Sequence, residues 1–130
     1  MANPNIVAVA AIYGTTTYLA PAGATAVVLL ANPAASGRVF KINQIVVANT
    51  TASAANTTVS VYTNGAVVQG SAPAGGTAYP VVSAVSVPAN ASLIAVDKST
   101  AIYLQEGTSI SVTSGTGGSL TYSISYEDIT

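Results

Sequence analysis

The sequence predicts an all-β fold, an antiparallel β-sandwich of jelly-roll-like form, and three observations lead to this prediction. Ser, Thr, Val and Gly abound, whereas the charged and amide residues that helices need on their polar faces are rare. Short apolar segments alternate with polar residues at a period of two. Turn-forming residues recur roughly every 8 to 12 positions, the spacing typical of a sandwich or barrel.

The chain has the length of one domain. At 130 residues, about two thirds of the surface of the unfolded chain can be buried, which is enough for one core. With one Phe and no Trp, that core must be built from small and β-branched side chains. We therefore expect residues 1–130 to form a single β-sandwich domain, with residues 1–5 as a candidate extended N-terminal arm.

The N-terminal half contains several candidate strands, and one of them is irregular. In residues 39–49 the large apolar side chains Phe40 and Ile42 have one parity, whereas Ile45 and Val47 have the other. A β-bulge near Asn43 or Gln44 explains this shift, and a central strand covered on both faces explains it equally well. Apolar segments bounded by Pro and Gly predict the other strands, at residues 6–13, 15–19 and 25–31.

The middle of the chain combines a turn signal with a loop. Alternation at residues 59–61 leads into Asn64-Gly65, the dipeptide favoured in two-residue type I′ turns, and predicts a hairpin in which residues 66–68 return. Residues 70–79 contain Pro and Gly and predict a protruding loop. Strands are expected again at residues 80–87 and 92–96.

The C-terminal third shows the clearest period. Residues 120–126 alternate between large apolar side chains and hydroxyls, and residues 109–113 do the same. The Ser- and Gly-rich link at 114–119 predicts that these two strands form a hairpin. Residues 102–104 lead into this pair through a turn at 105–108, so the final third is expected to be a meander.

The charge content bounds the partners of the chain. Seven side chains carry a formal charge, 5% of the chain, against about 25% in an ordinary soluble domain. A surface wetted by hydroxyls and amides lacks the like-charge repulsion that keeps monomers apart, and this favours assembly. A hydroxyl-rich secreted or surface domain has the same composition and is the alternative. With net charge −1 and no basic cluster, we expect no nucleic-acid binding, and no apolar run predicts a membrane helix.

The inventory of reactive side chains is nearly empty. The chain has no His and no Cys, which excludes the usual catalytic triad, thiolate chemistry and the common zinc sites. The adjacent acids Glu127 and Asp128 would point to opposite faces of a strand and could not converge on one substrate bond. We therefore expect neither enzymatic activity nor a cofactor or metal.

The seven tyrosines divide into two groups. Tyr122 and Tyr126 share the parity of the apolar residues around them and are expected in the core. Core alternation does not account for all of the others, which either pack at interfaces or supply aromatic platforms for a glycan. These other tyrosines are Tyr13, Tyr18, Tyr62, Tyr79 and Tyr103.

Five segments carry a resemblance to a known group of proteins. They are residues 1–7 (MANPNIV), 37–43 (GRVFKIN), 86–91 (SVPANA), 101–107 (AIYLQEG) and 125–129 (SYEDI). Together they span nearly the whole chain, which resembles the small virion structural proteins of tailed phages, in particular those of marine cyanobacterial phages.

The resemblance implies a β-sandwich subunit on the outer surface of a capsid. In this role it is a decoration, or cement, protein, a homotrimer whose partner is the major capsid protein. A component of the neck, tail or fibre is the structural alternative, and a glycan- or receptor-binding module is the alternative from another class. Candidate contact residues are Ala2, Asn3, Pro4, Asn5 and Ile6 in the arm, then Pro73, Gly75, Gly76 and Tyr79 in the loop.

The N-terminal segment allows two interpretations. Its apolar residues could pair with an open sheet edge of a neighbouring subunit. They could equally form an edge strand of their own domain.

Overall fold

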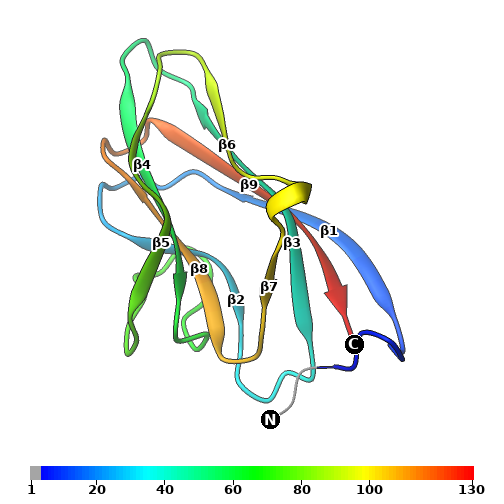
Figure 1. The fold of residues 1–130 in the computed structure, drawn as a ribbon. Coiled ribbons are helices and arrows are strands. Elements are labelled where there is room, and N and C mark those ends of the chain that lie inside the picture. The colour runs from blue at the N-terminus through cyan, green and yellow to red at the C-terminus, as the bar shows by residue number, and fades with distance from the viewer. Residues whose placement is uncertain (1–3) are drawn as a thin grey trace.

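Two antiparallel sheets make up the protein in a computed structural model that describes residues 4–130 (Figure 1). Sheet A has the strand order β1-β9-β3-β6, with β7 also paired to β3, and sheet B has the order β2-β8-β4-β5. The elements are β1 (Ile12–Leu19), β2 (Val27–Asn32), β3 (Val39–Asn49), β4 (Ala55–Tyr62), β5 (Ala78–Val87), β6 (Ser92–Val96), the 3-10 helix η1 (Lys98–Thr100), β7 (Ile102–Leu104), β8 (Thr108–Ser114) and β9 (Leu120–Ile129).

The strand order is that of a jelly roll. β6 and β7 pair with successive parts of β3 and act as one strand interrupted by η1. Apart from β4 to β5 and β6 to β7, every connection between described strands passes from one sheet to the other. This alternation produces the two Greek keys of a jelly roll. The expectation of an all-β antiparallel sandwich is therefore confirmed.

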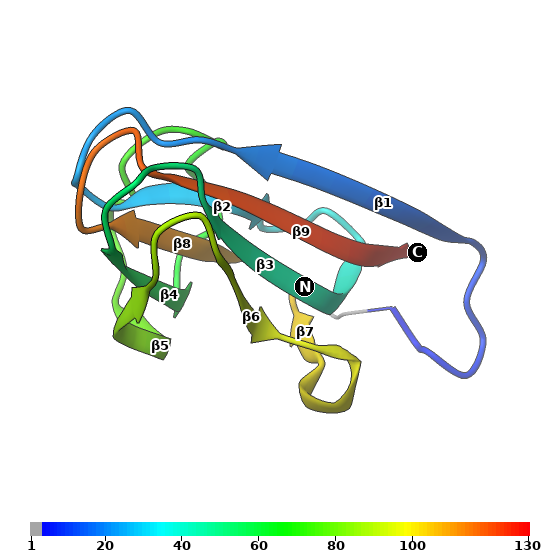
Figure 2. The ribbon, with the colours of Figure 1, turned by 90° about the horizontal axis from the view of Figure 1, so that it is seen from above.

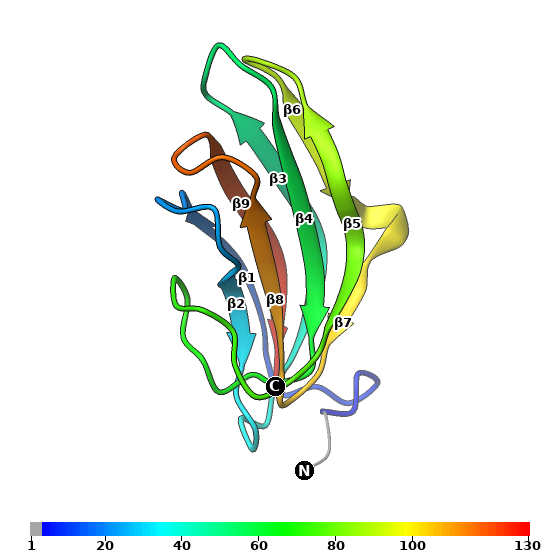
Figure 3. The ribbon, with the colours of Figure 1, turned by 90° about the vertical axis from the view of Figure 1, so that its left-hand side faces the viewer.

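The core lies between the two sheets. Figure 3 looks onto sheet B with the strands of sheet A behind it, and Figure 2 shows the two layers from above. Because side chains alternate along a strand, one face of each sheet supplies apolar residues to this space. Fully buried residues from both sheets include Leu29, Ile42, Ile45, Val59, Ile110, Val112, Leu120 and Ile124.

A β-bulge in β3 accounts for its shifted pattern. The register with β9 runs regularly to Ile42 opposite Tyr126, skips Asn43, and resumes with Gln44 opposite Ser125. After the bulge, Ile45 points into the core as Ile42 does before it, and both are fully buried. Apart from Val39 at the start of the strand, the residues of the other parity are partly or fully exposed, so the bulge is confirmed and the strand covered on both faces is excluded.

The strand predicted at residues 6–13 is wrong over most of its length. Residues 4–11 form no strand, and the first one begins at Ile12 and continues through Gly14 to Leu19. Asn5 organises a turn instead, because its side-chain oxygen accepts from the Val7 backbone N–H and its carbonyl from the Ala8 N–H. The apolar run at residues 6–13 does not alternate with polar residues, so its pattern does not show which of its residues pair with another strand.

The pairing predicted for the C-terminal third is also wrong. The strands at 102–104, 109–113 and 120–126 are present, but β8 belongs to sheet B while β7 and β9 belong to sheet A. The link 115–119 therefore crosses the sandwich rather than closing a hairpin. Alternation reveals which face of a strand is buried, but both sheets face the same core, so it does not reveal the partner strand.

Two buried asparagines join the sheets at opposite ends of the sandwich. Asn32 at the end of β2 donates through Nδ2 to the carbonyl of Leu104 in β7, at 3.0 Å. Asn49 at the end of β3 donates through Nδ2 to the carbonyl of Val87 in β5, also at 3.0 Å. Since a buried amide must be satisfied, each fixes one sheet against the other at a defined position.

Tyr122 supplies a third link between the sheets, through the core. Its ring is fully buried, and its hydroxyl lies 2.7 Å from Thr57 Oγ1 in β4 and donates to the Thr113 carbonyl in β8. Burial raises the pKa of Tyr122 above its ordinary value of 10.0, and the hydrogen bond with Thr57 opposes this only in part. Burial, with the nearby Asp128, also raises the pKa of Tyr126.

The raised pKa values of Tyr122 and Tyr126 predict that the protein loses stability at alkaline pH. The folded state holds the Tyr122 proton more tightly than the unfolded state does, so the contribution of Tyr122 to the free energy of unfolding is constant below pH 10 and falls as pH rises beyond it. Tyr122→Phe should be less stable at neutral pH by about 1.5 kcal/mol, from the lost hydrogen bonds, but should fall less steeply in alkali. Urea denaturation at neutral and alkaline pH measures both effects. Tyr103→Phe, on an exposed side chain, is the control, and equal slopes for the two variants would contradict the assignment.

Candidate functional site

The charged side chains of sheet A are engaged within the fold. Arg38 pairs with Asp128 at 3.1 Å, and Lys41 lies 3.7 Å from Glu127. The amide of Asn43 also donates to Glu127, at 3.2 Å. The two adjacent acids thus bind different cations and do not form a carboxylate pair.

Two further acids hold turns. Glu106 accepts from the backbone N–H groups of Ala35 and Gly37, each at 3.1 Å, and so fixes the loop between β2 and β3. Asp97 caps η1, and hydrogen bonds from the Ser99 side chain and backbone hold the pKa of Asp97 below its ordinary value. With the ion pairs, six of the seven charged side chains serve the fold. Little charge is left for recognising a ligand.

Residues 4–130 contain neither a candidate metal site nor a helix that could span a membrane. There, no group of three or more acidic, His or Cys side chains is placed to hold a metal ion. Nor does this part of the chain form a helix with the length and apolar character needed to cross a membrane.

The exposed tyrosines do not form one platform. Tyr13 and Tyr18 lie on β1, Tyr79 on β5 and Tyr103 on β7, all more than half exposed. Since β1 and β5 are end strands of different sheets and lie on opposite sides of the sandwich (Figure 3), Tyr13 and Tyr18 lie apart from Tyr79. Tyr62 is buried instead, because its hydroxyl exchanges hydrogen bonds with the backbone N–H and carbonyl of Gly76.

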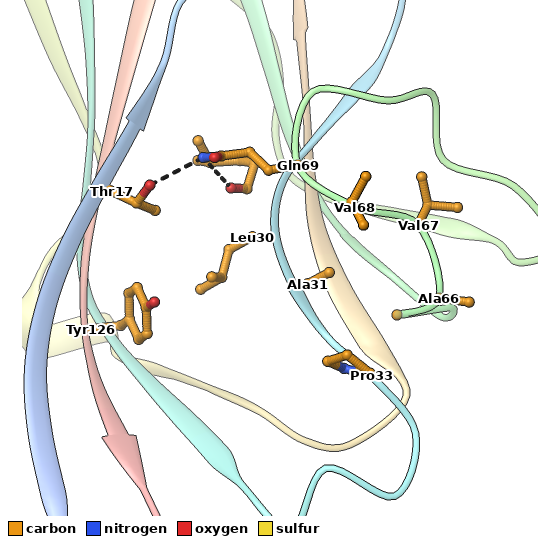
Figure 4. A pocket seen from close by; sticks show the side chains of 11 residues that line it. Thr17, Leu30, Ala31, Pro33, Ala66, Val67, Val68, Gln69 and Tyr126 are labelled. Atoms are coloured by element: carbon orange, nitrogen blue, oxygen red, sulfur yellow. Dashed lines mark hydrogen bonds between the residues drawn. The ribbon is translucent and has the colours of Figure 1, made fainter.

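A small cleft lies between the ends of the two sheets on the β1 and β2 side (Figure 4). It has a volume of about 330 Å³, at the lower limit for pockets that bind small molecules. Its lining is mostly apolar and comes from β1, β2, β9 and the loop 63–77 that joins β4 to β5: Thr17, Leu29, Leu30, Ala31, Pro33, Gly65, Ala66, Val67, Val68, Gln69 and Tyr126.

Gln69 closes one end of this cleft by joining the two sheets. Its Nε2 donates to Thr17 Oγ1 of β1 at 3.2 Å and to the Leu29 carbonyl of β2 at 3.0 Å, as Figure 4 shows. The only amide group lining the cleft is thereby committed to the protein itself. None of the described residues that line the cleft carries a charge.

The loop 63–77 is not the tight hairpin predicted at Asn64-Gly65. β4 ends at Tyr62 and pairs with Ala78 at the start of β5, so residues 66–68 return beside no strand. Asn64 instead bonds the Ala74 carbonyl through Nδ2, at 2.7 Å, and holds the loop closed. Residues 70–77 of the loop predicted at 70–79 form no strand, but Gly70 and Ser71 bond β2, and Tyr79 belongs to β5.

Three of the four sheet edges are protected. Loop residues Gly70 and Ser71 cover the edge of β2 by exchanging backbone hydrogen bonds with Val28. β5 contains Pro80, a positive φ of 50° at Ala84, and two register shifts against β4. β6 and β7 have only five and three residues. Loops, prolines, bulges and short strands all hinder the addition of another strand.

The edge of β1 has none of these protections. Its eight residues pair with β9 in an unbroken register and include no charge and no proline. Its exposed side chains include Ile12, Tyr13 and Tyr18, which are 52%, 64% and 71% exposed. A long, regular, uncharged edge of this kind is a template for pairing with another chain.

The predicted contact residues are only partly brought together. Ala2 and Asn3 lie outside the described residues, Pro4 is half-buried, and Asn5 and Ile6 are exposed in the turn before β1. The next residue, Val7, is 91% exposed. The other predicted residues lie in or after the loop 63–77, with Pro73 half-buried and Gly75, Gly76 and Tyr79 exposed.

Sequence reasoning missed the β1 edge as a surface. The signal was present in residues 12–19, whose composition is uncharged and β-prone. What the sequence did not show is that β1 ends a sheet, since that depends on pairing with β9 at the far end of the described chain.

Comparison with known proteins yielded no relative. No family model matches the chain, and no curated protein or solved structure matches it either.

Proposed function

We propose that this protein is a non-enzymatic structural subunit of a virion, a capsid decoration protein that binds the major capsid protein lattice from outside. The observation that carries the proposal is the unprotected β1 edge on a jelly roll whose charges are committed internally. Such a surface suits a subunit that is permanently packed against other proteins rather than a free monomer. The resemblance of five segments to virion proteins of tailed phages supports the same context.

The proposed assembly is a homotrimer, as the resemblance implies. Jelly rolls recur in viral capsid domains and in lectins, so the fold alone does not select between these roles. The scattered positions of Tyr13, Tyr18, Tyr79 and Tyr103 favour subunit packing over a glycan platform, because stacking on a sugar needs rings that share one surface.

Reconstruction of the particle of the virus that encodes this chain tests the proposal. We expect density for the jelly roll at many equivalent positions on the outer capsid surface, in contact with the major capsid protein. Density confined to the neck, tail or fibre would contradict the capsid assignment. A particle that lacks the chain altogether would contradict the virion context.

A further inference from the structure

The backbone groups on the free edge of β1 can be assigned from one end of the strand. Ala11 and Thr130 exchange both of their backbone hydrogen bonds, at 3.4 and 3.0 Å. Since such pairs alternate along an antiparallel ladder and the β1–β9 register is unbroken, the odd-numbered residues of β1 bond β9. The even-numbered residues from Ile12 to Tyr18 therefore direct N–H and C=O groups away from the sheet.

This row of outward groups is almost free. Among the described residues its one recorded side-chain contact is from Gln69, whose Nε2 lies 3.5 Å from the Tyr18 carbonyl. A carbonyl oxygen can accept a second hydrogen bond. The whole row is thus available to another strand.

We propose that β1 pairs antiparallel with β1 of a second copy, which joins two A sheets into one continuous sheet around a two-fold axis. The inference rests on the proposed self-association of the chain and not on its place in a virion. Identical antiparallel strands related by such an axis must pair residues of equal parity, so that side chains keep to their own faces.

The exposed apolar side chains select the register. With Thr15 opposite Thr15 of the second copy, Ile12 faces Tyr18 and Gly14 faces Thr16. The two large exposed side chains then cover each other twice across the dyad. A shift of two residues in one direction places Ile12 opposite Ala20, and a shift in the other direction places Tyr18 opposite Ala10, so both leave a large side chain uncovered.

The two-fold contact is compatible with the proposed trimer but separate from it. A two-fold pairing cannot close a ring of three, so the smallest closed particle in which a chain makes both contacts has six copies. Without the trimer contact it forms dimers. In either case the copy number is even.

A single engineered cysteine tests the register, because the chain has no cysteine of its own. Thr15 of each copy would form a non-hydrogen-bonded pair, with Cα atoms about 4.5 Å apart, a distance that a disulfide spans. Under mild oxidation most of the Thr15→Cys protein should run as a cross-linked dimer. Ser83→Cys, exposed in the middle of β5, is the matched control. Absence of the Thr15→Cys dimer, or equal cross-linking of the control, would overturn the proposal.

The mass in solution supplies an independent readout. Thr16→Pro removes an N–H on the free edge and none that bonds β9, a position at which edge strands tolerate proline. Light scattering should give an even number of copies for the native protein and half that mass for Thr16→Pro. Thr16→Lys is the second variant if the proline chain does not fold. A native mass of one or three copies would refute the β1 contact and leave the virion assignment standing.

Discussion

Replacing Gly65 with alanine should destabilise the protein by about 3 kcal/mol or more. A Cβ at this position would press against the Asn32 carbonyl oxygen and lie 2.7 Å from the Thr108 carbonyl oxygen. Both obstacles are backbone atoms of β2 and β8, which are paired with each other and cannot move independently. The free energy of unfolding from urea denaturation measures the loss.

Gly23→Ala is the matched control for this variant. Nothing lies closer than 3.9 Å to a Cβ at Gly23, so the free energy of unfolding should change by less than about 0.5 kcal/mol. Equal stability of the two variants would show that the loop around Gly65 can shift, and would contradict the close packing between this loop and the end of β2.

Removal of the Asn32 amide should be comparably severe. Its side chain is fully buried and donates to the carbonyls of Arg38 and Leu104, while its Oδ1 accepts from Ser36. Asn32→Leu keeps the approximate shape but leaves both carbonyls without this donor. We expect a loss of about 3 kcal/mol, because each stranded buried group costs about 1 to 3 kcal/mol.

The comparison variant for Asn32 is Asn56→Leu. Asn56 lies on the exposed face of β4, so its replacement should change the free energy of unfolding by less than about 0.5 kcal/mol. Thermal and urea unfolding of both variants measure these changes in stability. If Asn32→Leu proves as stable as the native chain, the amide does not hold the two sheets together.

Features of the fold that depend on a single strand were predictable from the sequence. The shift of parity between Ile42 and Ile45 located an irregularity in the strand, because burial of one face forces the apolar residues to follow the pleat, but it left open whether this was a bulge or a strand covered on both faces. For the same reason Tyr122 was correctly assigned to the core, where it is fully buried. Both inferences needed only the local pattern and the existence of a core.

Features that depend on distant parts of the chain were not predictable. Asn64-Gly65 has the composition of a tight turn, but Gly65 is required because Asn32 and Thr108 approach it from two other strands. The bridge that Gln69 makes to Thr17 and Leu29 has no local signal either. An exposed polar residue in a loop has the same pattern whether or not it reaches another strand.

The position of β9 between β1 and β3 has a consequence during synthesis of the chain. Thr16 and Ser125, whose hydroxyls lie 3.0 Å apart, are separated by 109 positions in the sequence. Sheet A therefore cannot be completed until the ribosome has made nearly all of the described residues, and pairings at such separation close slowly. Until β9 has been synthesised, both edges of β1 are open. Nascent chains that emerge near one another can therefore pair through their β1 strands before each chain completes its own sheet.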